Sequence, residues 1–134
     1  MNLNLAPGLL EEIVEHAKAV YPNEACGLLA GRNNMAGRFI PMQNTRASQT
    51  EYEMDPGQLV KELRSIRESG NTLVGIFHSH PFGPPQPSRR DVDGFHYPEA
   101  ACLIVSLEDA DHPRAVAFRI IESEVSAIEL HVIV

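Results

Sequence analysis

Residues 73–91 constrain the fold and the chemistry of this chain more than any other stretch. The segment begins with apolar residues typical of a buried strand and reaches two histidines, His78 and His80, that are separated by one residue. Because side chains alternate between the faces of a strand, both imidazoles are expected to face the same point. Two imidazoles arranged in this way can chelate a single metal ion.

A proline-rich loop and a predicted helix start follow the two histidines. Ser88 is a favourable N-cap residue, and Asp91 lies in the first turn of the helix that it would begin. Two histidines and one carboxylate form a three-ligand set for catalytic zinc, in which water takes the fourth position. We therefore predict that His78, His80 and Asp91 bind one Zn²⁺ ion per chain.

Each part of this pattern also has an ordinary structural explanation. A histidine can be a surface or core residue, Ser-x-x-Asp can be only a helix cap, and a proline-rich segment can be only a loop. The full pattern His-x-His-Pro-x6-Ser-x-x-Asp is much rarer than any of its parts. It fixes five residues, and if each has a chance of roughly one in twenty, a chance match is expected on the order of once in 100,000 short chains. The combination therefore favours a metal site.

The charge and hydropathy of the chain exclude several classes of protein. With 11 basic and 18 acidic residues, the formal net charge is −7, which disfavours a nucleic-acid partner because phosphate binding needs a basic surface. No run approaches the ~20 apolar residues of a membrane span, and no signal peptide is visible, so we expect a cytoplasmic protein without a membrane partner. The length of 134 residues predicts a single domain, 1–134.

Cysteines and arginines near the predicted site have competing interpretations. Cys26 and Cys102 lie in apolar segments and are expected to be buried thiols in a reducing compartment. Cys26 follows Glu24 closely, but no neighbour in the sequence would activate it as a nucleophile. Arg89 and Arg90 are interpreted as a solvated helix face, with a contact to a substrate carboxylate as the alternative.

The apolar pattern predicts, in order, a helix, a hairpin, a helix, a strand, a short helix and three strands. The predicted helices span residues 7–20, 56–69 and 88–95. The predicted strands span residues 24–31, 38–42, 72–79, 101–107, 114–121 and 125–134. His16, in the first helix, is expected to face solvent. This order predicts an α+β domain with an α/β/α layered arrangement, in which helices flank a mixed central sheet.

The chain resembles the JAMM/MPN-type metalloproteases. Their signature is a glutamate at the start of a strand, followed much later by His-x-His-Pro-x6-Ser-x-x-Asp. This chain has every element at the family's spacing: Glu24, His78, His80, Ser88 and Asp91. Three further segments look like the family's small bacterial members: Glu-Ala-Cys-Gly-Leu-Leu-Ala-Gly, Tyr-Glu-Met-Asp-Pro and Leu-Ile-Val-Ser-Leu. The resemblance covers nearly the whole chain and implies a cytidine-deaminase-like α/β/α fold.

The resemblance also implies a zinc-dependent peptidase or isopeptidase that acts at the C-terminus of a ubiquitin-like or sulfur-carrier protein. It implies that Glu24 is the general base and then the general acid, and that Ser88 helps the metal to stabilise the oxyanion. The connections in this chain look short, so polyubiquitin-chain specificity is not carried over. Members of the family often form homodimers, and the oligomeric state of this chain stays open.

Other functions compete with this interpretation. One is a metal-free scaffold of the same fold, although such relatives usually lack some of the signature residues that are all present here. Another is a metal-dependent hydrolase that acts on a small amide or a cell-wall peptide. A RadC-type, DNA-repair-associated relative is disfavoured by the acidic charge and by Glu24. A non-haem iron oxygenase is disfavoured by the order of the ligands. The sequence does not identify the substrate or the pathway.

Overall fold

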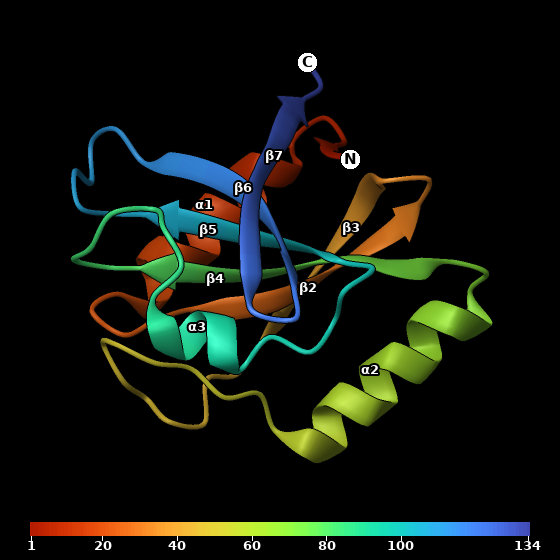
Figure 1. The fold of residues 1–134 in the computed structure, drawn as a ribbon, viewed down its shortest axis with the longest axis horizontal. Helices are drawn as coiled ribbons and strands as arrows, with labels where there is room; N and C mark the ends of the chain where they lie inside the picture. The colour runs from red at the N-terminus through yellow and green to blue at the C-terminus, as the bar shows by residue number, and fades with distance from the viewer.

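A mixed seven-stranded sheet organises the fold, and three helices pack against it (Figure 1). The computed structural model describes residues 1–134. The strands are β1 (Asn2–Leu5), β2 (Cys26–Arg32), β3 (Met35–Met42), β4 (Thr72–His80), β5 (Ala101–Ser106), β6 (Arg114–Ile121) and β7 (Glu124–Val132). The helices are α1 (Leu9–Val20), α2 (Pro56–Glu68) and α3 (Arg89–Asp93). The strand order is β1-β3-β2-β4-β5-β6-β7, and β1 also pairs with β7, so the sheet closes into a barrel.

The α1 helix packs on one face of the sheet. Leu9, Ile13 and Ala17 recur every fourth residue, form one apolar face of the helix and are all buried. These residues belong to the largest apolar cluster, which also contains Phe77 of β4 and Leu103 of β5. Burial of this face holds α1 against the sheet.

The α2 helix packs on the other face. Asp55 caps the helix by accepting a hydrogen bond from the N–H of Gln58 at 2.8 Å. Ile66 is buried in a second apolar cluster, together with Ile76 of β4. Because neighbouring strand residues point to opposite faces, Ile76 and Phe77 direct α2 and α1 to opposite sides of β4.

The β4 strand lies in the middle of the sheet, with antiparallel β2 on one side and parallel β5 on the other. Every residue from Val74 to His80 is buried, as expected for a strand that is covered on both faces. His78 lies opposite Cys26 of β2 and Ile104 of β5. The predicted metal-binding histidines therefore occupy the buried carboxyl end of this strand.

The predicted α+β class with a mixed sheet is confirmed. The apolar pattern does not predict β1, a four-residue strand with buried Leu3 and Leu5 that pairs with the distant strands β3 and β7. The prediction that His16 faces solvent is only partly right, because the residue is half-buried. Its ring lies 5.6 Å from that of Phe39, and its Nε2 is buried without a hydrogen-bond partner.

The two cysteines are free and buried, as predicted. Burial raises the pKa of the Cys26 thiol to about 12, and burial raises the pKa of the Cys102 thiol to about 12 as well. Thiols of this kind are inert at neutral pH, which agrees with a structural role. None of the three helices combines the length and the hydropathy needed to cross a lipid bilayer.

Candidate metal centre

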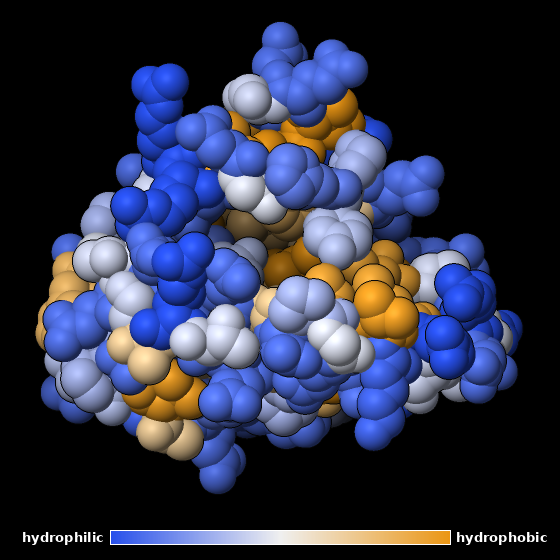
Figure 2. All heavy atoms as spheres, turned by 90° about the horizontal axis from the view of Figure 1, so that it is seen from below, coloured by the Kyte–Doolittle hydropathy of each residue, from blue (hydrophilic) through white to orange (hydrophobic).

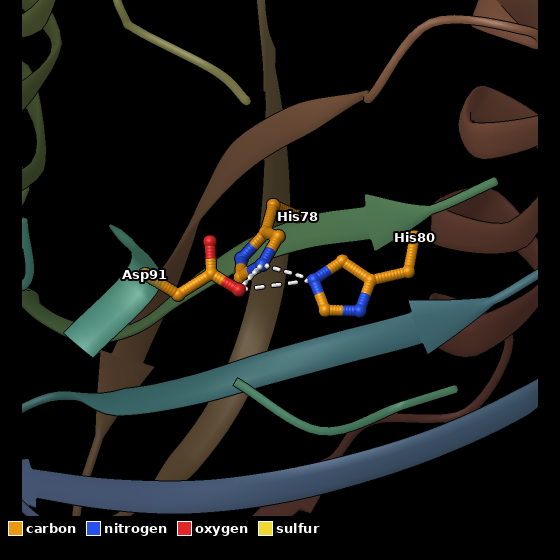
Figure 3. Close-up of side chains that lie close together, drawn as sticks. All are labelled: His78, His80 and Asp91. Atoms are coloured by element: carbon orange, nitrogen blue, oxygen red, sulfur yellow. Dashed lines mark hydrogen bonds and ion pairs between the residues drawn. The ribbon is translucent and has the colours of Figure 1, made fainter. Parts of the chain in front are cut away.

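The end of β4 directs two imidazoles to one point (Figure 3). His78 and His80 are 1% and 9% exposed, and their Nε2 atoms lie 3.1 Å apart. The one-residue spacing produces this convergence, because residues i and i+2 of a strand share a face. The sequence prediction of two histidines facing the same point is confirmed in this geometry.

The third group arrives from the first turn of α3. Ser88 caps this helix: its Oγ accepts a hydrogen bond from the N–H of Asp91 at 3.1 Å, and Asp91 Oδ2 accepts one from the N–H of Ser88 at 2.9 Å. The same Oδ2 atom lies 3.1 Å from His78 Nε2 and 3.0 Å from His80 Nε2. The helix cap thus aims the carboxylate at the two imidazoles.

These three groups fit the requirements of a zinc ion. The ligand atoms of His78, His80 and Asp91 lie within 4.8 Å of one another. The side chains are almost fully enclosed, and two nitrogens with one carboxylate oxygen form the donor set of catalytic zinc sites. The donor chemistry and the convergence therefore support a metal centre at this position.

The electrostatics of the cluster favour the metal-binding protonation states of Asp91 and His78. Burial alone would raise the pKa of Asp91, but the hydrogen bonds to His78 and His80 hold it well below its usual range. Burial lowers the pKa of His78. Burial opposes the charged form of His80, yet Asp91 and the carbonyl of Pro84 raise the pKa of this imidazole. An ionised carboxylate and a neutral His78 are ready to act as ligands.

Glu24 lies beside this centre with an unsatisfied side chain. It directly precedes Ala25 and the start of β2, is only 3% exposed, and its Oε1 has no hydrogen-bond partner. Burial raises the pKa of Glu24 to about 8, despite the opposing charge of His80. Glu24, His80 and Ser88 line a common cavity of about 440 Å³. A buried carboxyl group with this pKa is suited to proton transfer at neutral pH.

Tyr52 is a member of the site that the sequence analysis does not identify. Its ring stacks on that of His78, with centroids 4.8 Å apart and planes inclined by 25°. Tyr52 belongs to the Tyr-Glu-Met-Asp-Pro segment noted for its resemblance to the family, but no local spacing links it to His78. Tyr52 and Asp91 also line a larger cavity of about 600 Å³. Figure 2 shows a hollow with an apolar floor on the face of the molecule where this cavity lies.

Three other residues, Ser79, Arg89 and Arg90, lie near the candidate metal centre but do not belong to it. Ser79 is fully buried and accepts a hydrogen bond from the N–H of Ala25 at 2.8 Å, which indicates a structural role. Arg90 forms an ion pair with Glu51 at 2.6 Å, and Arg89 is almost fully exposed. Arg89 therefore fits the predicted solvated face, whereas Arg90 has a partner within the chain.

Comparison with known proteins gives three further findings. Residues 6–121 match the family described as prokaryotic homologs of the JAB domain (Prok-JAB). The CysO-cysteine peptidase of Mycobacterium tuberculosis is 34% identical over 127 residues, which cover 93% of this chain and 87% of that protein. A probable TtuB-protein conjugate cleaving protease of Thermus thermophilus is 44% identical over 86 residues, 63% of this chain and 57% of that protein.

A solved structure shares the fold over nearly the whole chain. The solution structure of a Desulfitobacterium hafniense protein aligns with a TM-score of 0.88 and 33% identity. The alignment covers 99% of this chain and 93% of that chain. The closed mixed sheet is therefore not peculiar to this sequence.

Proposed function

This chain belongs to the family of prokaryotic JAB-domain homologs, and we propose that it is a zinc-dependent metallopeptidase that cleaves a peptide or isopeptide bond. The observation that carries the proposal is the convergence of His78 Nε2, His80 Nε2 and Asp91 Oδ2 beside the unsatisfied carboxyl group of Glu24. Three ligands, an adjacent proton acceptor and an open cavity are the parts that metal-assisted amide hydrolysis requires.

We assign His78, His80 and Asp91 as the ligands of one zinc ion per chain. The assignment is supported by their nearly complete burial and by the low pKa of Asp91. A bound zinc ion supplies Lewis-acid chemistry and lowers the pKa of a coordinated water from 15.7 to about 7.

Glu24 is assigned as the general base and then the general acid. Its Oε1 takes up a proton from the attacking water and later delivers a proton to the leaving amine. Two observations support this role: the free Oε1 atom and the raised pKa of Glu24, which is close to neutral pH. A carboxyl group of ordinary pKa would hold the transferred proton less well at the same pH.

Ser88 is assigned as a donor to the oxyanion. Its Oγ accepts from the N–H of Asp91, which leaves the hydroxyl proton free to donate into the cavity that Ser88 shares with Glu24. A fixed donor at this point stabilises the negative charge that develops on the carbonyl oxygen. The capping bonds fix the position of this donor without consuming its proton.

We propose that the substrate is a ubiquitin-like or sulfur-carrier protein with an amide-linked group at its C-terminus. The names of the related CysO-cysteine peptidase and TtuB-conjugate protease support this class. The walls of the cavity beside Glu24 combine polar side chains, such as those of Thr50 and Ser88, with Phe82 and the prolines of the loop after β4.

We further propose that residues 1–134 act as one cytidine-deaminase-like domain in the cytoplasm, without a nucleic-acid or membrane partner. The net charge of −7 supports the absence of nucleic acid. A homodimer remains an expectation from the family, and light scattering of the purified protein would test it.

The activity test uses zinc-loaded protein and a panel of carrier proteins whose C-termini are extended by one amide-linked amino acid. Mass spectrometry is expected to show release of that amino acid by the wild type and not by Glu24→Gln. Cleavage of short unrelated peptides at an equal rate would overturn the proposed substrate class. No cleavage of any substrate by protein that contains zinc would overturn the peptidase assignment.

A further inference from the structure

We propose that Tyr52 is a positioning residue for His78 and that a loop closed around Asn44 holds it in place. The loop comprises residues 44–54 and is called the clamp loop. The inference rests on the proposed function, because it concerns how a zinc ligand keeps its orientation.

The two histidine ligands differ in what fixes their rings. His80 donates a hydrogen bond from Nδ1 to the carbonyl oxygen of Pro84 at 2.7 Å, which leaves its Nε2 available as a ligand. His78 has no such bond, since its Nδ1 is buried without a hydrogen-bond partner. Metal-binding histidines almost always make this second bond, and losing such a partner typically weakens metal binding by about 10- to 100-fold. His78 therefore needs another restraint.

Stacking by Tyr52 provides that restraint. The two rings are nearly parallel, with centroids 4.8 Å apart and an interplanar angle of 25°. Rotation of the imidazole out of this plane would separate the rings. The stack therefore keeps His78 Nε2 directed at Asp91 Oδ2, which lies 3.1 Å away.

The side chain of Asn44 closes the clamp loop with four hydrogen bonds. Its Nδ2 donates to the carbonyl oxygens of Glu24 and Glu51, each at 3.0 Å. Its Oδ1 accepts from the backbone N–H groups of Arg46 and Glu53, at 3.0 and 3.1 Å. Because Glu51 and Glu53 flank the stacked tyrosine, these bonds fix the backbone on both sides of it.

The clamp loop also touches the other parts of the site. The N–H of Glu24 donates to the carbonyl oxygen of Ser48 at 2.8 Å, so both backbone polar groups of the proposed base are bound by the loop. Arg90, the neighbour of Asp91, pairs with Glu51 at 2.6 Å. One loop thus contacts the base, one ligand ring and the helix that carries the third ligand.

The test measures the zinc dissociation constant of the metal-free full chain by competition with a chromophoric chelator. Tyr52→Leu removes the stacked ring, and Tyr52→Phe retains it. Tyr97→Leu is the matched control, because Tyr97 lines the same large cavity but its ring meets that of Phe95 edge to face and does not stack on His78. Tyr52→Leu is expected to weaken zinc binding by about 10-fold or more, whereas Tyr52→Phe and Tyr97→Leu should stay close to the wild type.

Asn44→Asp is the second variant, because it leaves both rings in place. It keeps an acceptor for the two backbone N–H groups but loses the donor to the carbonyls of Glu24 and Glu51. This variant is also expected to weaken zinc binding. Thermal unfolding of its metal-free form should remain cooperative, which would show that the variant is folded.

Each outcome decides a different point. Wild-type zinc affinity in both Tyr52→Leu and Asn44→Asp would overturn the positioning role. Equal weakening by Tyr52→Leu and Tyr52→Phe would overturn stacking as its cause. A wild-type chain that binds no zinc would instead overturn the proposed function on which the inference rests.

Discussion

Ser88 and Asp91 exchange hydrogen bonds across the first turn of α3, and the oxygen of Asp91 that completes this cap also faces the two histidines. Asp91 Oδ2 lies 2.9 Å from the Ser88 nitrogen and 3.0 Å from His80 Nε2. A helix of five residues has little stability of its own. The cap therefore determines where the carboxylate points, and one oxygen serves both the helix cap and the proposed metal centre.

Ser88→Ala tests both roles of this serine. Loss of the acceptor for the Asp91 N–H is expected to lower the free energy of unfolding by about 1 kcal/mol. Loss of the oxyanion donor is expected to lower kcat by about 100-fold or more. Ser88→Thr keeps the hydroxyl and should therefore retain most of the stability and most of kcat. Denaturant unfolding and steady-state kinetics measure the two effects, and an unchanged kcat would refute the oxyanion role.

Glu24→Gln separates metal binding from proton transfer. The amide cannot accept the proton, so turnover is expected to fall by about 100-fold or more. The zinc content should equal that of the wild type, because Glu24 is not among the three ligands. Elemental analysis and the cleavage assay, run on the same preparation, check both statements. Full activity of this variant would contradict the assignment of Glu24.

Glu24 also makes the stability of the metal-free protein depend on pH. Burial raises the pKa of its carboxyl group from 4.5 to about 8, so the folded state keeps a proton that the unfolded state loses. The stability that Glu24 contributes is complete below pH 4.5 and is lost as the pH rises through about 8. Glu24→Gln is expected to remove this loss of stability, because the amide of glutamine does not ionise.

Calorimetry of the metal-free wild type and of Glu24→Gln checks this dependence. The variant is expected to unfold several degrees higher than the wild type at pH 8, and the difference should shrink toward pH 4.5. A difference in Tm that does not change with pH would show that the carboxyl group of Glu24 is not held in its protonated form.

Gly31→Ala tests the close approach of β2 and β3. A Cβ at Gly31 would clash with the carbonyl oxygen of Met35, a backbone atom of the paired strand. The expected cost in unfolding free energy is about 1–3 kcal/mol, because such a clash forces a backbone shift. Gly37→Ala is the matched control on β3, since its added Cβ meets no atom within 4 Å. Equal stability of the two variants by denaturant unfolding would contradict the observed β2–β3 geometry.

The convergence of the three proposed metal ligands is predictable from the sequence because the information that places them is local. The one-residue spacing of His78 and His80 and the capping pattern of Ser88 and Asp91 each specify a geometry within a single element. Only the meeting of the two elements requires the tertiary structure. For the same reason, the helices and most strands follow from apolar periodicity.

The parts that escape prediction depend on contacts between distant residues. Tyr52 stacks on a histidine of another element, and no periodicity encodes that contact. The short β1 strand is defined by its pairing with β3 and β7. The pairing with β7 joins the two ends of the chain and closes the sheet. His16 reads as a surface residue of α1, but packing against Phe39 on β3 buries part of its ring.

The zinc content of the purified protein, compared between the wild type and Asp91→Ala, tests the central claim most directly. After dialysis against a weak chelator and mass spectrometry of the bound metal, we expect about one zinc per wild-type chain and almost none in the variant, because two histidines alone form a weak site. One equivalent of zinc in Asp91→Ala would remove Asp91 from the ligand set. No zinc in the wild type, even after zinc is added to the folded protein, would contradict the metallopeptidase account.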